Sequence, residues 1–236
     1  MNNSTRKYRV VEELEQIPFL VHGFGTRYWK EEDFASVQDL AVFHRVSLRQ
    51  THSDIIRLIT QYPKEKMEGD VLVTDLPGTL LIIRTADCLP ILIVDTQNRA
   101  VAAVHCGWRG TLKRIIEKTL RTMQQRYGSD FASLSVALGP CIASSCYEVG
   151  EDVREKFKNK GLLRGVFDSH PSKKEKYLFD LRGANRAQIL ALGVPDKNIF
   201  SIDLCTHCDL DLFSYRRDRD HAGRLINFIG LSQSPE

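Results

Sequence analysis

The sequence lacks the features that mark membrane proteins and nucleic-acid-binding proteins. None of its apolar runs approaches the ~18 residues that a membrane span needs, and the first ten residues, MNNSTRKYRV, contain no apolar core of a secretion signal. The net charge is only +3, from 33 basic and 30 acidic residues, so no strongly basic surface is implied. We therefore expect a cytoplasmic protein that binds neither nucleic acid nor a membrane.

Several familiar catalytic motifs are also absent. The chain has no GxxxxGKS/T phosphate loop and no GxGxxG dinucleotide loop. None of its seven His has another His two residues away, which excludes the His-x-His pairs of a four-copper oxidase. A zinc deaminase of the cytidine type is excluded too, because H-x-E and P-C-x-x-C are missing. A single copper ion at a smaller site stays open.

The composition is that of a folded globular protein, with 42% hydrophobic and 27% charged residues. A length of 236 residues is within reach of one α/β domain, so we expect a single domain over residues 1–236. The six Cys are expected to stay reduced, because a large chain without a secretion signal seldom forms disulfides.

Three short apolar runs form the centre of the chain. Residues 79–83, 89–94 and 100–104 are rich in β-branched side chains and too short for helices, which predicts buried strands. Asp87 and Cys88 precede the second run, and Pro90 has no N–H for a strand ladder, so a break or bulge is predicted over residues 86–90. Asp87 is expected to orient a ligand or a turn N–H, or to form a simple turn.

The third run leads into His105 and the turn residues GWRGT. Apolar residues then recur at helical spacing over residues 112–127, and Gly128 ends the predicted helix. Strand, turn and helix in this order place Arg109 beside the free N–H groups of a helix N-terminus, which favours a phosphate or a carboxylate.

His52 stands at the start of another predicted strand, residues 55–59. A single His is more often a surface or core residue than a ligand. Together with Cys88 and His105, however, it would complete a working site at the ends of buried strands. Further strands are predicted at residues 133–138, 199–203 and 225–229, and helices at residues 150–160 and 181–192.

The chain from about residue 48 to its C-terminus resembles the YfiH/YlmD family, whose members are labelled multicopper polyphenol oxidase, laccase-domain protein or peptidoglycan editing factor. The stretches that carry the resemblance are RTADCLPILIVD, AAVHCGWRGT, LGPCIASSCYEVG, FDLRGANRAQILALGV, and CTHCDLDLFSYRRD followed by HAGR. The segment near residues 25–47 is shorter here than in most members, so no substrate contact that this segment makes in other members is carried over to this chain.

The resemblance implies a mixed α+β fold, a four-layer α/β/β/α sandwich with mixed sheets. It also implies a metal site of two His and one Cys, which fall on His52, Cys88 and His105. Three protein ligands with a fourth position open are typical of catalytic zinc, and copper is also possible.

The activity implied by the resemblance is zinc-dependent chemistry on purine nucleosides, with phosphate as the second substrate. Members are described as phosphorolysing adenosine, inosine and methylthioadenosine and as deaminating adenosine. His52, Cys88, His105 and Arg109 would form the catalytic site. Arg216, Arg217 and Arg224 are candidates for binding phosphate or the leaving base.

Three other interpretations stay open at this stage. A copper-binding polyphenol oxidoreductase would use the same three ligands. A cysteine hydrolase or amidase, editing a peptidoglycan precursor, would use Cys88 as the thiolate nucleophile and His105 as the base. A structural zinc site of Cys141, Cys146, Cys205 and Cys208 would make the chain a binding module without activity.

Overall fold

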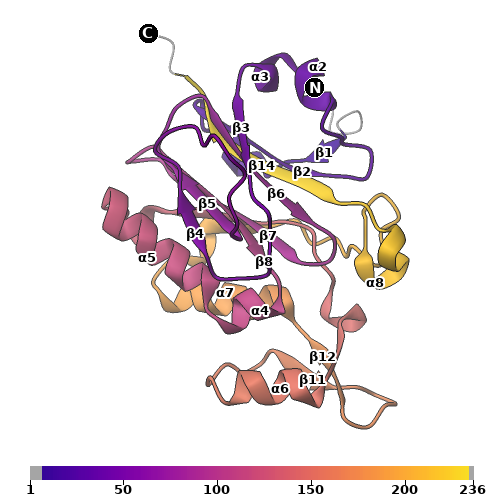
Figure 1. The fold of residues 1–236 in the computed structure, drawn as a ribbon. Coiled ribbons are helices and arrows are strands. Elements are labelled where there is room, and N and C mark those ends of the chain that lie inside the picture. Colours follow the sequence, from indigo (N-terminus) through magenta and orange to yellow (C-terminus); the bar gives the residue numbers. More distant parts are fainter. Residues whose placement is uncertain (1–6, 234–236) are drawn as a thin grey trace.

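Two large mixed sheets packed face to face form the centre of the protein, whose computed structural model describes residues 7–233 (Figure 1). In the five-stranded sheet only the edge strand β3 runs parallel to its neighbour β6. In the six-stranded sheet both edge strands run parallel to their neighbours, and the inner pairs are antiparallel. In spatial order the first sheet contains β1 (Tyr8–Arg9), β2 (Leu20–Gly25), β14 (Leu225–Leu231), β6 (Thr79–Thr85) and β3 (His44–Ser47). The second contains β13 (Ile199–Ser201), β9 (Ser135–Leu138), β7 (Leu89–Asp95), β8 (Ala100–Cys106), β5 (Val71–Thr74) and β4 (Ile56–Leu58).

The central strands β7 and β8 are buried on both faces. Successive side chains of a strand point to opposite faces, and in β7 Leu92 and Val94 enter the core between the two sheets. Ile91 and Ile93 enter the second core, between the six-stranded sheet and the helices. This double burial explains why the sequence shows continuous apolar runs here instead of alternation.

Helices cover the outer face of each sheet. Short helices α2 (Asp33–Ser36) and α3 (Gln38–Ala41) pack on the five-stranded sheet, where Trp29 and Phe34 meet Phe228 of β14. On the six-stranded sheet lie α4 (Trp108–Leu112), α5 (Ile115–Tyr127) and α7 (Leu181–Ala191) (Figure 1). The order of layers is α/β/β/α, so the predicted mixed α+β sandwich with mixed sheets is confirmed.

A small three-stranded sheet extends from the helical side, at the bottom of Figure 1. It contains β10 (Glu148–Gly150), β12 (Lys176–Phe179) and β11 (Phe167–Ser169), and α6 (Glu151–Lys158) lies beside it. The remaining α-helices are α1 (Glu12–Glu15) and α8 (Tyr215–Asp218). Among residues 7–233, no helix is both long and apolar enough to cross a membrane.

The strands predicted at residues 79–83, 89–94 and 100–104 are confirmed as parts of β6, β7 and β8. Two boundary predictions were wrong. The break is confined to residues 86–88, because Pro90 pairs with His105 inside β7, near the start of that strand. The helix predicted over residues 112–127 begins only at Ile115, as α5, because Arg114 takes a left-handed φ of 57° and separates it from the short helix α4, which ends at Leu112.

Candidate metal centre

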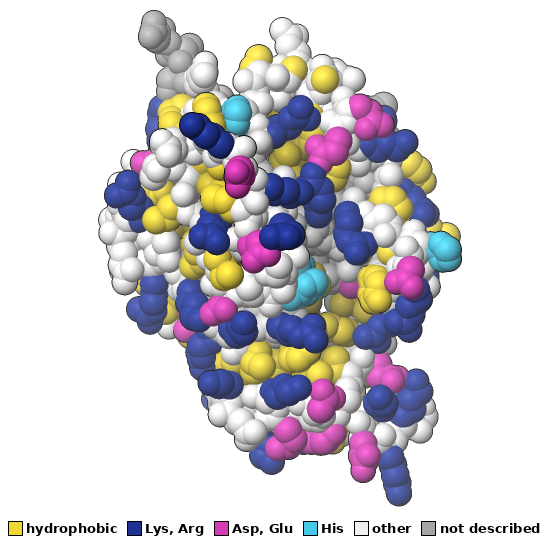
Figure 2. Space-filling model, viewed as in Figure 1, with side chains coloured by type: hydrophobic (Ala, Val, Ile, Leu, Met, Phe, Trp, Pro, Cys, Tyr) yellow, Lys and Arg dark blue, Asp and Glu magenta, His cyan; other side chains and the backbone are white. Residues whose placement is uncertain are grey.

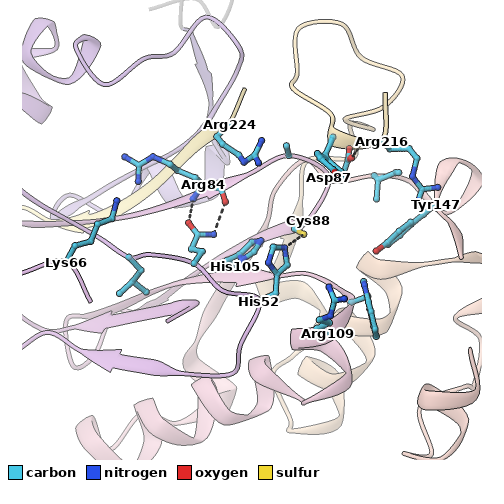
Figure 3. A pocket seen from close by; sticks show the side chains of 16 residues that line it. His52, Lys66, Arg84, Asp87, Cys88, His105, Arg109, Tyr147, Arg216 and Arg224 are labelled. Atoms are coloured by element: carbon cyan, nitrogen blue, oxygen red, sulfur yellow. Dashed lines mark hydrogen bonds between the residues drawn. The ribbon is translucent and has the colours of Figure 1, made fainter. Parts of the chain in front are cut away.

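His52, Cys88 and His105 meet at one point in the structure. One ligand atom from each lies within 4.8 Å of the other two, and His52 Nε2 is 3.8 Å from Cys88 Sγ (Figure 3). His105 lies on β8, Cys88 just before β7 and His52 in the turn before β4. The pairing of Pro90 with His105 brings the start of β7 beside the end of β8. The antiparallel register therefore places the Cys88 thiol next to the His105 ring.

Asp70 holds the two histidines in place, and the sequence analysis missed it. This fully buried carboxylate lies directly before β5, and its Oδ1 is 2.7 Å from His105 Nδ1. It also accepts the backbone N–H groups of His52, at 3.1 Å, and Ser53, at 2.6 Å. A charged residue directly before the buried run Val71–Thr74 is the signal that could have found it, because a buried carboxylate needs partners.

Asp87 does not contact the three candidate ligands in any hydrogen bond among the described residues. Its carboxylate accepts the Thr206 hydroxyl at 2.6 Å and the backbone N–H of Arg216 at 2.5 Å. Its own φ of 83° is left-handed. Asp87 therefore orients a backbone N–H in the first turn of helix α8 (Tyr215–Asp218), not one of a local turn, and it joins the break before β7 to the loop of Thr206 and to α8.

The protonation states of the site depend on its mutual contacts. Burial by itself would raise the pKa of the Cys88 thiol, but the charge of His105 and hydrogen bonds from both histidines lower it to about 6. Burial would lower the pKa of His105, whereas Cys88 and Asp70 raise it to about 9. Hydrogen bonds from His105 and Ser53 outweigh burial and lower the pKa of Asp70 to about 2. Cys88 is thus a thiolate near neutral pH, the form that binds metals and attacks electrophiles.

The donor set fits a metal ion. Because His105 Nδ1 is engaged by Asp70, its Nε2 is the nitrogen left for a ligand, and the carboxylate fixes that tautomer. His52 presents Nε2 to the same point as the Cys88 thiolate. Two imidazoles and one thiolate suit zinc or copper and leave a coordination position for water or substrate.

The site opens into a cavity of about 640 Å³ with a strongly basic lining. Five cationic side chains line it: Lys66, Arg84, Arg109, Arg216 and Arg224. Figure 3 shows Lys66, Arg84 and Arg224 on one side of the two histidines, with Arg109 and Arg216 on the other. In the space-filling view, Lys and Arg side chains stand on several sides of the hollow in the middle of this face (Figure 2). The cavity suits a small anionic ligand or a phosphate.

The structure places three of the four predicted arginines at this cavity. Arg109, Arg216 and Arg224 line it, and the Arg109 guanidinium lies 4.6 Å from the centre of the Trp108 ring. Helix α4, which follows this turn, has only five residues. The N-terminus of so short a helix is a weak anion site, so the arginine side chains are left as the groups that can bind an anion.

Arg217 requires a correction. It is not among the described residues that line the cavity. Its guanidinium is engaged by the Asp218 carboxylate and by backbone carbonyls, including those of Thr206 and Leu212. Arg217 therefore holds the C-terminal loop together, and a substrate-binding role is not carried forward for it. The adjacent Arg216, in contrast, extends toward Tyr147.

Sequence analysis also missed Arg84 and Gln50, which build the opposite wall. The Gln50 side-chain amide bonds both the N–H and the C=O of Arg84, at 2.7 and 2.8 Å (Figure 3). The Arg84 guanidinium pairs with Glu31. The position of Arg84 near the end of the predicted strand, just before Cys88, was the available signal.

Changing Asp70 to Asn tests its role as a positioning residue. We expect zinc affinity to fall about 10- to 100-fold, as is usual when the partner of a ligating His is lost. The pKa of His105 should also fall in the metal-free protein, because a charge that raises it is removed. Chelator competition measures the first effect and NMR titration the second.

Asp95→Asn is the matched control for Asp70→Asn. Asp95 is an equally buried carboxylate that accepts the turn N–H groups of Gln97 and Asn98 at the far end of β7. Both variants should lose stability, measured by thermal unfolding, but only Asp70→Asn should lose zinc affinity. Equal zinc affinity in the two variants would show that Asp70 does not position the metal ligands.

The protein is a four-layer sandwich in which two His and one Cys meet in a basic cavity. This arrangement is typical of enzymes that act on small molecules. The family model described as multi-copper polyphenol oxidoreductase laccase matches residues 31–232, and the chain belongs to this family. Proteins of the family named YfiH and YlmD are among its relatives. The resemblance noted in the sequence is confirmed.

Two of the relatives are named for activities on purine nucleosides. A purine nucleoside phosphorylase of Clostridium acetobutylicum is 38% identical over 200 residues, 84% of this chain and 79% of that protein. A protein named adenosine deaminase RL5, from an unknown prokaryotic organism, is 38% identical over 194 residues, 78% of this chain and 72% of its own length. The structure of YlmD from Geobacillus stearothermophilus is similar with a TM-score of 0.86, at 26% identity and 98% coverage of both chains.

Proposed function

We propose that this protein is a zinc-dependent purine nucleoside enzyme that phosphorolyses adenosine, inosine and methylthioadenosine and also deaminates adenosine. The observation that carries the proposal is the meeting of His52, Cys88 and His105 within 4.8 Å in a basic cavity. The names of the relatives support the substrate class. A cavity of about 640 Å³ is within the usual size range for a small-molecule ligand.

His52, Cys88 and His105 would hold the zinc ion. Zinc with three protein ligands supplies Lewis acidity and lowers the pKa of a water toward ~7. Asp70 keeps His105 in the tautomer that can bind a metal, and hydrogen bonds from the surrounding backbone keep Asp70 in place.

In phosphorolysis, the bond from C1′ to the purine nitrogen breaks, and a bond from C1′ to a phosphate oxygen forms. Arg109 and Arg216 can bind the phosphate, because both line the cavity on the side of Tyr147 (Figure 3). The departing base takes up negative charge and then a proton. Burial raises the pKa of Tyr147, so its hydroxyl stays protonated and able to donate to the base.

Deamination replaces the 6-amino group of adenosine by oxygen from water and releases ammonia. For this reaction the base must lie with C6 toward His52 and Cys88, whereas phosphorolysis requires C1′ to face the phosphate. The side chain of Trp108 lines the cavity and offers a flat surface for either orientation of the purine.

Removing the metal from the wild-type protein tests this function. We expect chelation to abolish phosphate-dependent release of hypoxanthine from inosine and to abolish deamination of adenosine. Added zinc should restore both, because the ligands stay in the protein. The measurements are chromatography of the bases, with phosphate omitted as the control, and thermal unfolding to show that the metal-free protein is folded. Full activity without metal would contradict the proposal, as would phenol oxidation restored by copper alone.

A cysteine hydrolase is the second candidate, because Cys88, His105 and Asp70 also form a nucleophile, a base and an orienting carboxylate. Cys88 would attack the carbonyl carbon of an amide in a peptidoglycan precursor. The amine would leave with a proton from His105, and water would then hydrolyse the thioester. Amide cleavage by the metal-free protein, blocked by alkylation of Cys88, would favour this candidate over the zinc enzyme.

A further inference from the structure

A cluster of three thiols lies in two loops that border the cavity. Cys146, Cys205 and Cys208 each offer an Sγ atom, and the three atoms lie within 4.8 Å of one another. Cys146 ends the loop after β9, and the other two lie in the loop after β13. No side chain of this thiol cluster belongs to the candidate metal centre of His52, Cys88 and His105.

The local backbone holds these thiols in a turn typical of metal-binding loops. Cys205 and Cys208 have the C-x₂-C spacing, and the Cys208 N–H donates to the Cys205 carbonyl at 3.2 Å. The backbone N–H of Ala143, from the other loop, donates to Cys205 Sγ at 3.3 Å. Donors aimed at sulfur stabilise the thiolate, the form that binds a metal.

The distances fit a shared ion. Tetrahedral zinc with Zn–S bonds of ~2.3 Å separates its sulfur ligands by about 3.8 Å. The Sγ atoms of Cys146 and Cys208 are 3.4 Å apart, and no pair in the thiol cluster exceeds 4.8 Å. Small rotations of the side chains would bring all three to bonding distance of one ion.

The fourth cysteine considered in the sequence does not join this cluster. Cys141 is buried, with 1% of its surface exposed, and is absent from the ligand group found among the described residues. The structure therefore replaces the four-cysteine hypothesis with three ligands and one open position, on the side where Cys208 is exposed.

We propose that Cys146, Cys205 and Cys208 bind a zinc ion through three thiolates, at a second site separate from the candidate metal centre. Soft thiolate ligands select zinc over magnesium or calcium. The ion would join the loop after β9 to the loop after β13. Both loops reach the cavity, because Tyr147 follows Cys146 and the Thr206 hydroxyl donates to Asp87. Zinc at this position would hold in place the wall of the cavity that carries Tyr147.

Cobalt(II) titration of the full-length Cys88→Ala protein tests the proposal, because this variant lacks a ligand of the first site. We expect about one cobalt ion per chain, with a sulfur-to-cobalt charge-transfer band and the visible bands of tetrahedral coordination, both displaced by zinc. Adding Cys208→Ser should weaken binding at least about tenfold and diminish the charge-transfer band. Adding Cys141→Ala instead should leave the spectrum and the affinity unchanged.

Several results would overturn the second site. One is a Cys88→Ala protein that is folded by thermal unfolding but binds no cobalt. Another is undiminished binding after Cys208→Ser, and a third is loss of binding after Cys141→Ala. A Cys146–Cys208 disulfide in protein purified without oxygen, seen as the loss of two hydrogens by mass spectrometry, would also overturn it. Because none of these measurements uses nucleoside turnover, they are independent of the proposed function.

Discussion

Replacing Cys88 by Ala should remove one zinc ion per chain and reduce inosine phosphorolysis by about three orders of magnitude or more. Cys88 supplies the only thiolate among the three residues that meet at the candidate metal centre. A catalytic metal contributes several kcal/mol to the transition state, and each ~1.4 kcal/mol corresponds to a factor of ten in rate. Metal analysis and hypoxanthine release, measured on the same preparation, give the two numbers.

Cys141→Ala is the matched control for Cys88→Ala. Cys141 is also a cysteine near the cavity, but it is buried and lies outside the ligand group of the candidate metal centre. It should keep the zinc content and the rate of the wild type. If Cys88→Ala loses zinc but keeps its rate, the metal is not catalytic. If its zinc content equals that of the wild type but phosphorolysis is lost, Cys88 acts in the reaction in another way than as a metal ligand.

Replacing Gly107 by Ala should lower zinc affinity by about two orders of magnitude without unfolding the protein. A methyl group at this position would lie 2.9 Å from Cys88 Sγ and 3.3 Å from His52 Cδ2, so Cys88 would have to shift away from it and His52 would have to move slightly. The backbone is not the reason, because φ of −86° and ψ of 175° are ordinary values for Ala. The effect is therefore expected in the metal site and much less in stability. Chelator competition measures it.

Gly110→Ala tests whether the effect is specific to Gly107. Gly110 lies in α4, three residues further along the chain, and the nearest atoms to a methyl group there would belong to the Ile115 side chain, the first at 3.2 Å. Ala is also the better helix former. We expect wild-type zinc affinity for this variant. If both variants bind zinc as tightly as the wild type, Gly107 does not keep space for the ligands.

The candidate metal centre and the thiol cluster affect different parts of the cavity. Asp70 positions the candidate metal centre through its contacts with His105 and with the turn that carries His52. The thiol cluster borders the wall that carries Tyr147. If both bind zinc, loss of the first should reduce turnover directly, whereas loss of the second should loosen the wall.

The sequence by itself determined the central strands and the three candidate ligands. Strands β6, β7 and β8 are buried on both faces, so their apolar runs are continuous and easily recognised. Cys88 and His105 stand out because each is a polar residue at the edge of such a run, whereas His52 precedes the short and less buried β4 and was given its ligand role by the family resemblance. The family motifs include the same three residues.

Only the tertiary structure decided which other side chains reach the site. Asp70 and His105 are 35 residues apart, and they meet because β5 pairs with β8. Arg216 and Arg217 are neighbours in the sequence, yet one lines the cavity while the other is engaged by the loop. Sequence periodicity reports burial along one element, whereas contacts between elements depend on register and loop conformation. That is also why three cysteines, and not four, come together.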